Sequence, residues 1–106
     1  MPPARELHTF LPLTETTYYI LLALAEPLHG YGVMQKVEQI SEGTVQLGPG
    51  TLYGAFSQLE KEGFISKVSE EERRKLFVLT ERGRQLLKTH FNRLKIMVRS
   101  GESLAQ

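Results

Sequence analysis

The chain has 106 residues, enough for one domain that buries most of its apolar surface. It has no cysteine, which excludes disulfides and thiolate chemistry, and it has no apolar run near the roughly 20 residues that span a bilayer. We therefore expect a soluble, cytoplasmic protein without membrane association.

The charges are unevenly distributed along the chain. The net charge of +1 by itself argues weakly against a nucleic-acid role. Residues 1–53, however, hold two basic residues and five glutamates, whereas residues 54–106 hold eleven basic residues and seven glutamates. This C-terminal excess of positive charge would attract phosphates or acidic partners, although a solvated helix face would have a similar composition.

The N-terminal third predicts a short arm and one apolar helix. Residues 1–12 contain three of the five prolines and show no helical period, so we expect a flexible arm. Thr14 is suited to cap a helix, and Pro27 ends the segment. The unbroken apolar run 18–25 predicts a helix that needs partners on all sides. We expect one flank in the core and another against a second subunit; a central core helix of a monomer is the alternative.

A second helix is predicted after His29-Gly30-Tyr31-Gly32. Its apolar stripe is formed by Tyr31, Met34, Val37 and Ile40, and Gly43 stops it. We expect Tyr31 to lock this helix into the core. The segment 44–47 alternates and is β-prone, which predicts a short strand with one bridge.

The histidines do not indicate a metal site. His29 fits a helix cap or a position at the core edge better than a metal ligand. The other two histidines, His8 and His90, are distant in sequence and lack acidic or cysteine companions that could complete a metal site. We predict no metal site and no cofactor.

The helix predicted over residues 51–62 is the best candidate for DNA recognition. It follows a Gly-Pro-Gly turn and ends before Gly63, the residue type that most easily adopts the left-handed conformation past a helix end. Leu52, Phe56 and Leu59 recur at i, i+4 and i+7, so one face is apolar. The other face is small or hydrogen-bonding, with one central positive charge, and consists of Thr51, Tyr53, Gly54, Ser57, Gln58 and Lys61. Such a face suits insertion into a DNA major groove.

The C-terminal half predicts a hairpin and a long helix. The β-prone runs 65–68 and 76–79 flank a charged loop, 69–75. Thr80 is suited to cap the last helix, where Leu87, Phe91, Leu94 and Val98 form an apolar stripe longer than one core requires.

The order of elements predicts a mainly α fold with a small β-hairpin, in the α+β class. Helix, helix, short strand, helix, hairpin and long helix is the order of a winged helix-turn-helix domain followed by a dimerisation helix. We place the winged domain at residues 13–79 and the C-terminal dimerisation helix at residues 80–106.

With these elements placed, the sequence resembles the PadR family of bacterial transcriptional regulators over about residues 13–95. The matching motifs are Leu21-Leu22-Ala23-Leu24, His29-Gly30-Tyr31-Gly32, Gly50-Thr51-Leu52-Tyr53, Leu59-Glu60-Lys61-Glu62-Gly63-Phe64-Ile65 and Leu79-Thr80-Glu81-Arg82-Gly83. The resemblance implies a homodimer that binds palindromic operator DNA, usually represses transcription and is often released by a small molecule. It assigns the helix from Thr51 to recognition and the hairpin, residues 66–78, to the wing. The single helix after the wing is similar to the smaller subfamily that lacks a separate C-terminal domain.

Two features depart from the family pattern. The wing contains three consecutive glutamates, residues 70–72, an unusual charge beside phosphate. Tryptophan is absent, so an effector pocket cannot rely on indole stacking.

The recognition helix supplies five candidate DNA-binding residues. The resemblance places Tyr53 at the DNA surface, with packing on the hairpin as the alternative. Gln58 is the expected base reader, because a carboxamide can bond adenine at two points, and Lys61 the expected phosphate contact. Thr51 and Ser57 face the same way, but they could equally be solvent-facing.

The wing and its surroundings supply the remaining candidates. Arg73 and Arg74, with Lys75, would bring the wing to a phosphate or a minor groove, unless the adjacent glutamates neutralise them. Lys36 and Lys67 are lesser phosphate candidates.

The first and last helices carry the candidate dimer and effector interface. Its predicted residues are Tyr18, Tyr19, Leu22, Leu87, Phe91, Leu94 and Val98. A filled dimer core without an effector is the alternative.

Two other classes of function compete with DNA binding. A winged-helix protein–protein interaction module, without sequence-specific DNA binding, could use the same surface for an acidic partner. An enzyme is not predicted, because the chain has no cysteine, aspartate, paired histidines or Walker-type phosphate loop.

Overall fold

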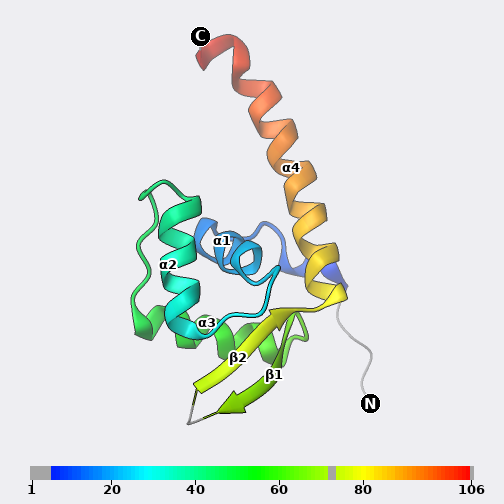
Figure 1. The fold of residues 1–106 in the computed structure, drawn as a ribbon. Helices are drawn as coiled ribbons and strands as arrows, with labels where there is room; N and C mark the ends of the chain where they lie inside the picture. The colour runs from blue at the N-terminus through cyan, green and yellow to red at the C-terminus, as the bar shows by residue number, and fades with distance from the viewer. Residues whose placement is uncertain (1–5, 72–73, 106) are drawn as a thin grey trace.

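Helix α1 (Glu15–Ala23) lies at the centre of the computed structural model, which describes residues 6–71 and 74–105 (Figure 1). Thr14 caps it as predicted, because its Oγ1 accepts a hydrogen bond of 3.1 Å from the Thr17 N–H. Ile20 and Leu21 are fully buried, with α2 on one side of the helix and α4 on the other. The same chain therefore covers most of this apolar helix.

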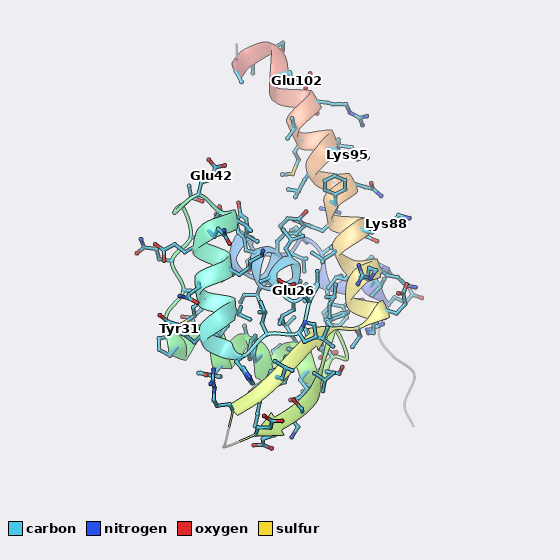
Figure 2. The ribbon with its side chains drawn as sticks, viewed as in Figure 1. Glu26, Tyr31, Glu42, Lys88, Lys95 and Glu102 are labelled. Atoms are coloured by element: carbon cyan, nitrogen blue, oxygen red, sulfur yellow. The ribbon has the colours of Figure 1, made fainter. Side chains whose placement is uncertain are left out.

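Helix α2 (Gly30–Ile40) buries Val37 of the predicted stripe and packs Met34 against the core, but it does not bury Tyr31. Gly30, Val33 and Val37 face the core, whereas Tyr31 is 64% exposed and points away from the body of the protein (Figure 2). The prediction that Tyr31 locks the helix into the core was wrong. The stop was correct, since Gly43 has φ +80° and ends the turn after the helix.

The strand predicted at residues 44–47 is also wrong. A side chain, and not a neighbouring strand, satisfies the backbone of this segment: Ser41 Oγ accepts a hydrogen bond of 3.1 Å from the N–H of the buried Val45. An isolated bridge is made by Leu28 instead, whose N–H and C=O both bond the backbone of Phe77 at 3.0 Å. The loop before α2, and not the loop before α3, therefore lies along the hairpin.

Helix α3 (Pro49–Lys61) starts two residues earlier than predicted. Pro49 occupies the first turn, where its missing N–H leaves no bond unmade. Leu52, Phe56 and Leu59 are buried as predicted, and Gly63 has φ +81° past the helix end. The opposite face of α3 is left at the surface.

The hairpin consists of β1 (Ile65–Glu71) and β2 (Arg74–Leu79), paired antiparallel. Both strands extend into the segment predicted as a charged loop. Glu70 pairs with Lys75 and Glu71 with Arg74, and opposite charges on facing residues stabilise such a pair of strands.

Helix α4 (Glu81–Ala105) starts in the core and ends outside it. Thr80 caps it as predicted, its Oγ1 accepting the Gly83 N–H at 3.0 Å and donating to the Gly63 carbonyl at 2.6 Å. Its buried residues end at His90, and the C-terminal half projects away from the body (Figures 1 and 2). The fold is thus a winged helix-turn-helix with a long C-terminal helix. Among residues 6–71 and 74–105, no helix combines the length and apolarity needed to cross a membrane.

Candidate nucleic-acid interface

The solvent-facing side of α3 carries all five of its predicted DNA-binding residues. The exposed set is Thr51, Tyr53, Ser57, Gln58 and Lys61. Gly54 lies among them, and a Cβ added there would meet nothing within 4 Å. The small residue therefore serves no packing contact within the chain, which leaves this face free for a groove.

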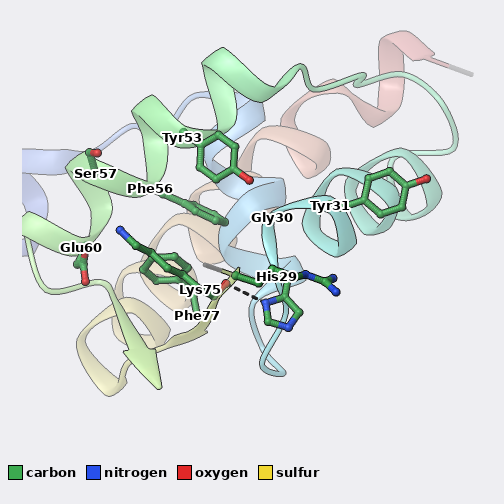
Figure 3. Close-up of a pocket in the computed structure, with 10 residues that line it drawn as sticks. His29, Gly30, Tyr31, Tyr53, Phe56, Ser57, Glu60, Lys75 and Phe77 are labelled. Atoms are coloured by element: carbon green, nitrogen blue, oxygen red, sulfur yellow. Dashed lines mark hydrogen bonds between the residues drawn. The ribbon is translucent and has the colours of Figure 1, made fainter. Parts of the chain in front are cut away.

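The side chain of Tyr53 extends from α3 toward the start of α2. It is 55% exposed, and its ring meets Phe56 edge-on, with the centroids 6.0 Å apart. Its hydroxyl lies over Gly30, where an added Cβ would be 2.6 Å from Tyr53 Oη (Figure 3). Packing against Phe56 therefore holds the Tyr53 ring in place, while about half of the side chain remains exposed.

A cleft of about 430 Å³ separates α3 from the wing. The lining residues come from the start of α2, from α3 and from β2: His29, Gly30, Tyr31, Tyr53, Phe56, Ser57, Glu60, Arg74, Lys75 and Phe77 (Figure 3). Arg74 and Lys75 line the wing side of this cleft. The α3 side carries the hydroxyls of Tyr53 and Ser57 and the carboxylate of Glu60.

His29 was predicted as a cap or core-edge residue, and its position at the N-cap of α2 is confirmed. Its side chain makes no capping bond and instead joins Nδ1 to the Lys75 carbonyl oxygen at 3.0 Å. His29 and Gly30 were not among the predicted site residues. The His29-Gly30-Tyr31-Gly32 motif was the signal that could have indicated them.

One ion pair partly neutralises the charge of the wing, and it involves Lys67. Lys67 Nζ lies 3.3 Å from Glu70 Oε2, while Arg74 is exposed at the start of β2. The predicted contact Arg73 lies outside the described residues. Lys36 is half-buried on α2.

The predicted dimer and effector residues lie where α1 meets α4. Tyr18, Tyr19 and Leu94 line a cleft of about 420 Å³ that also includes Arg93 and Met97. A second hollow, of about 330 Å³, is lined by Tyr18, Phe91, Leu94, Lys95, Val98 and Arg99.

Not every predicted interface residue is available to a partner. Phe91 is 48% and Val98 64% exposed, and Leu22 is half-buried. Leu87 is only 8% exposed, because it packs into the core of its own chain. The prediction that Leu87 faces a second subunit or an effector is therefore corrected: it is a core residue.

His90 forms the floor of the cleft between α1 and α4. It is 5% exposed, its Nδ1 accepts the Leu13 N–H at 3.4 Å, and its ring lies 5.2 Å from that of Tyr18. Burial, and then the charge of Arg93, lower the pKa of His90, whereas burial, and then Tyr19, raise the pKa of Tyr18. Both groups are therefore neutral near pH 7. Among the described residues, no three His or Glu side chains gather as metal ligands would.

Acid is expected to destabilise the protein through His90. An unfolded histidine has a pKa of about 6.5, so the unfolded chain binds more protons than the folded one just below that pH. The free energy of unfolding should therefore fall as pH drops below about 6.5 and contain no His90 contribution above it. Chemical denaturation from pH 5 to pH 8 should show a shallower decline for His90→Gln than for the native protein. His8→Gln, at an exposed position, controls for the loss of a histidine as such, and equal declines in all three proteins would contradict the assignment.

Comparisons with known proteins agree with this fold. The family model of the transcriptional regulator PadR-like family matches residues 20–89. An uncharacterised 37.1 kDa protein in transposon TN4556 of Streptomyces fradiae is 45% identical over 69 residues, which are 64% of this chain and 19% of that protein. The transcriptional regulator YqjI of Escherichia coli is 28% identical over 69 residues, 65% of this chain and 33% of that protein.

The chain thus spans about a fifth to a third of the length of these two relatives. Among solved structures, a transcriptional regulator from Clostridium thermocellum superposes with a TM-score of 0.71 at 22% identity, over 87% of this chain and 93% of that one. The structural likeness establishes the winged helix-turn-helix fold, and the family match covers most of the chain, so the chain belongs to the PadR-like family of transcriptional regulators.

Proposed function

We propose that the protein is a homodimeric repressor that binds palindromic operator DNA through α3 and the wing. The observation that carries this proposal is the uncovered side of α3, where small and hydrogen-bonding side chains surround the open position Gly54. A face without bulk or negative charge at its centre can approach base edges in a major groove closely.

Each part of the interface has a separate task in this proposal. Gln58 reads a base edge, and its exposed amide donates a long hydrogen bond of 3.4 Å to Glu62. Tyr53 and Lys61, with the wing residues Arg74 and Lys75, contact the sugar–phosphate backbone and set the register of the helix.

Dimerisation explains the uncovered stripe of α4. Phe91, Leu94 and Val98 lie on one side of a helix that projects from the domain, and a second copy would bury them. We infer that the partner helix places two copies of α3 about 34 Å apart, one turn of B-DNA. A small apolar effector in the cleft at Tyr18 and Tyr19 would change that separation and release the operator in the cytoplasm.

Replacing Gln58 with alanine is expected to weaken binding to the operator by tenfold to a hundredfold. One good two-point contact to a base contributes about 1–3 kcal/mol of discrimination, and about 1.4 kcal/mol corresponds to a factor of ten. The measurement is a titration of labelled promoter DNA, and of scrambled DNA of the same length, across a salt series.

Gln85→Ala is the matched control, because Gln85 is also an exposed helical glutamine but lies on α4. It should leave both affinities unchanged. Equal, sequence-indifferent binding by the native protein and the Gln58 variant would rule out α3 as the reading element.

A protein–protein interaction module is the second candidate, favoured by the acidic half of the wing. Glu70 and Glu71 lie in β1 opposite Lys75 and Arg74, and Glu70 also lies 3.3 Å from Lys67 Nζ, so carboxylates stand beside the wing's cations. If the native dimer retained no DNA even at low salt, this function would replace the first.

A further inference from the structure

The N-cap residue of α2, His29, and the first residue of the helix, Gly30, contact the two sides of the candidate interface, the wing and α3. His29 bonds the wing at the Lys75 carbonyl, and Gly30 lies under the hydroxyl of Tyr53 (Figure 3). We propose that His29 is a positioning residue that fixes the wing relative to the recognition helix. This inference rests on the proposed DNA-binding function, because the wing matters only if it meets a ligand beside α3.

The attachment of β2 to the rest of the domain becomes sparser toward its tip. Leu79 N–H bonds the Leu24 carbonyl at 2.8 Å, and Phe77 exchanges two bonds of 3.0 Å with Leu28. The next attachment outward is the bond from His29 to Lys75, and it is made by a side chain. The position of Lys75 and Arg74 therefore depends on a contact that a single substitution can remove.

Packing adds little support in this outer part of the wing. The ring of Phe77 meets Phe56 of α3 with the centroids 4.8 Å apart, at the base of the cleft. Outward from there Leu76 is half-buried, and Lys75 and Arg74 are exposed. Because apolar contacts end before Lys75, we infer that the hydrogen bond from His29 limits how far Lys75 and Arg74 can move away from α3.

The recognition helix is positioned by the adjacent residue. A Cβ at Gly30 would lie 2.6 Å from Tyr53 Oη and 3.2 Å from Leu52 Cδ2, so α3 packs directly on the backbone of α2 here. Two consecutive residues therefore contact the two sides of the cleft: His29 bonds the wing, and Gly30 packs against α3.

The bond also specifies the protonation of the ring. A carbonyl oxygen can only accept, so Nδ1 of His29 must carry a hydrogen, and in the neutral ring Nε2 is then the acceptor. A residue that acted only as a helix cap would accept from a backbone N–H instead, and the side chain of His29 makes no such bond. The Nδ1–H tautomer is therefore the one expected for a residue that bonds the wing, and the Nε2–H tautomer the one expected for a helix cap.

Two substitutions test the proposal without changing charge. Serine and asparagine are both favoured N-cap residues, so neither should weaken α2. Asparagine places an amide N–H close to the position of Nδ1, whereas the serine hydroxyl is too short to reach the Lys75 carbonyl. The variants are therefore His29→Ser, which lacks the bond, and His29→Asn, which can remake it.

The first readout needs no DNA. Amide hydrogen exchange of residues 74–76 is expected to accelerate about tenfold in His29→Ser, because one hydrogen bond is lost, and to return toward the native rate in His29→Asn. Nitrogen NMR of the native protein should show the Nδ1–H tautomer. Native exchange rates in His29→Ser, or an Nε2–H tautomer with Nδ1 unprotonated, would overturn the proposal.

The second readout is binding to the operator. His29→Ser is expected to bind about tenfold more weakly, with footprint protection lost at the positions flanking those contacted by α3, and His29→Asn should restore it. Equal loss in both variants would also overturn the proposal, since it would show that the donor is irrelevant. If the native protein does not bind DNA, the proposed function fails, and the exchange and tautomer measurements still decide the role of His29.

Discussion

Replacing Gly83 with alanine is expected to lower the free energy of unfolding by about 3 kcal/mol, the upper end for overpacking a closed site. The added Cβ would collide with the backbone carbonyl of Phe64 and lie 2.7 Å from Leu79 Cδ1. The carbonyl cannot simply move aside, because it accepts the Thr80 N–H at 3.0 Å. The first turn of α4 would have to separate from the junction between α3 and β1. Urea denaturation, followed by circular dichroism, measures the loss.

Gly101→Ala is the matched control for this substitution. Gly101 also lies within α4, but a Cβ there would meet nothing within 4 Å. Alanine at an open helical position is expected to raise stability by about 0.5–1 kcal/mol, because glycine costs more conformational entropy. A Gly83 variant as stable as the Gly101 variant would show that α4 does not pack on Phe64 in the way described.

Replacing Val98 with aspartate is expected to convert the proposed dimer to monomers and to weaken operator binding by at least about a hundredfold. A charge at the C-terminal end of the α4 stripe would have to be buried without a partner. Two half-site contacts that are no longer linked also lose their mutual effective concentration, which is worth about 10² to 10⁴ in affinity. Sedimentation velocity measures the mass, and titration with full-site and half-site DNA measures the affinities.

Ser100→Asp is the control, two residues further along the same exposed part of α4. Two residues turn a helix by about 200°, so Ser100 lies on the far side from Val98. This variant should keep the native mass and affinity. A Val98 variant that remained dimeric would refute the assignment of the stripe, whereas a monomeric variant with unchanged full-site affinity would refute the need for a dimer.

Short-range features of the fold were predictable from the sequence. The caps Thr14 and Thr80, the stops Gly43 and Gly63, and the buried stripe of α3 depend on residues within one or two helical turns. Such features are local because their hydrogen bonds and side-chain faces are set by the backbone geometry of a single element. The family resemblance, carried by the same segments, was confirmed.

The sequence predictions were wrong where a segment could pack or pair with more than one other part of the chain. In α2 a stripe through Tyr31 and a stripe through Gly30 are both possible, and hydrophobicity favours the wrong one because glycine has no side chain to count. Gly30 is buried since Leu52 and Tyr53 pack onto it from α3. The failure of the strand at residues 44–47 has the same origin, because Leu28 bonds Phe77 and Ser41 satisfies the Val45 backbone.

The local pattern of residues predicted the helices, most of their ends, the presence of the hairpin and the polar face of α3, because each follows from periodicity, capping and turn preference. Tertiary packing decided which residues meet across the cleft. His29 reaches Lys75 over 46 positions of sequence, and Leu87 is withdrawn from the exposed stripe into the core. Both outcomes depend on how separate elements dock, and docking is set by the shape and volume of side chains distant in sequence.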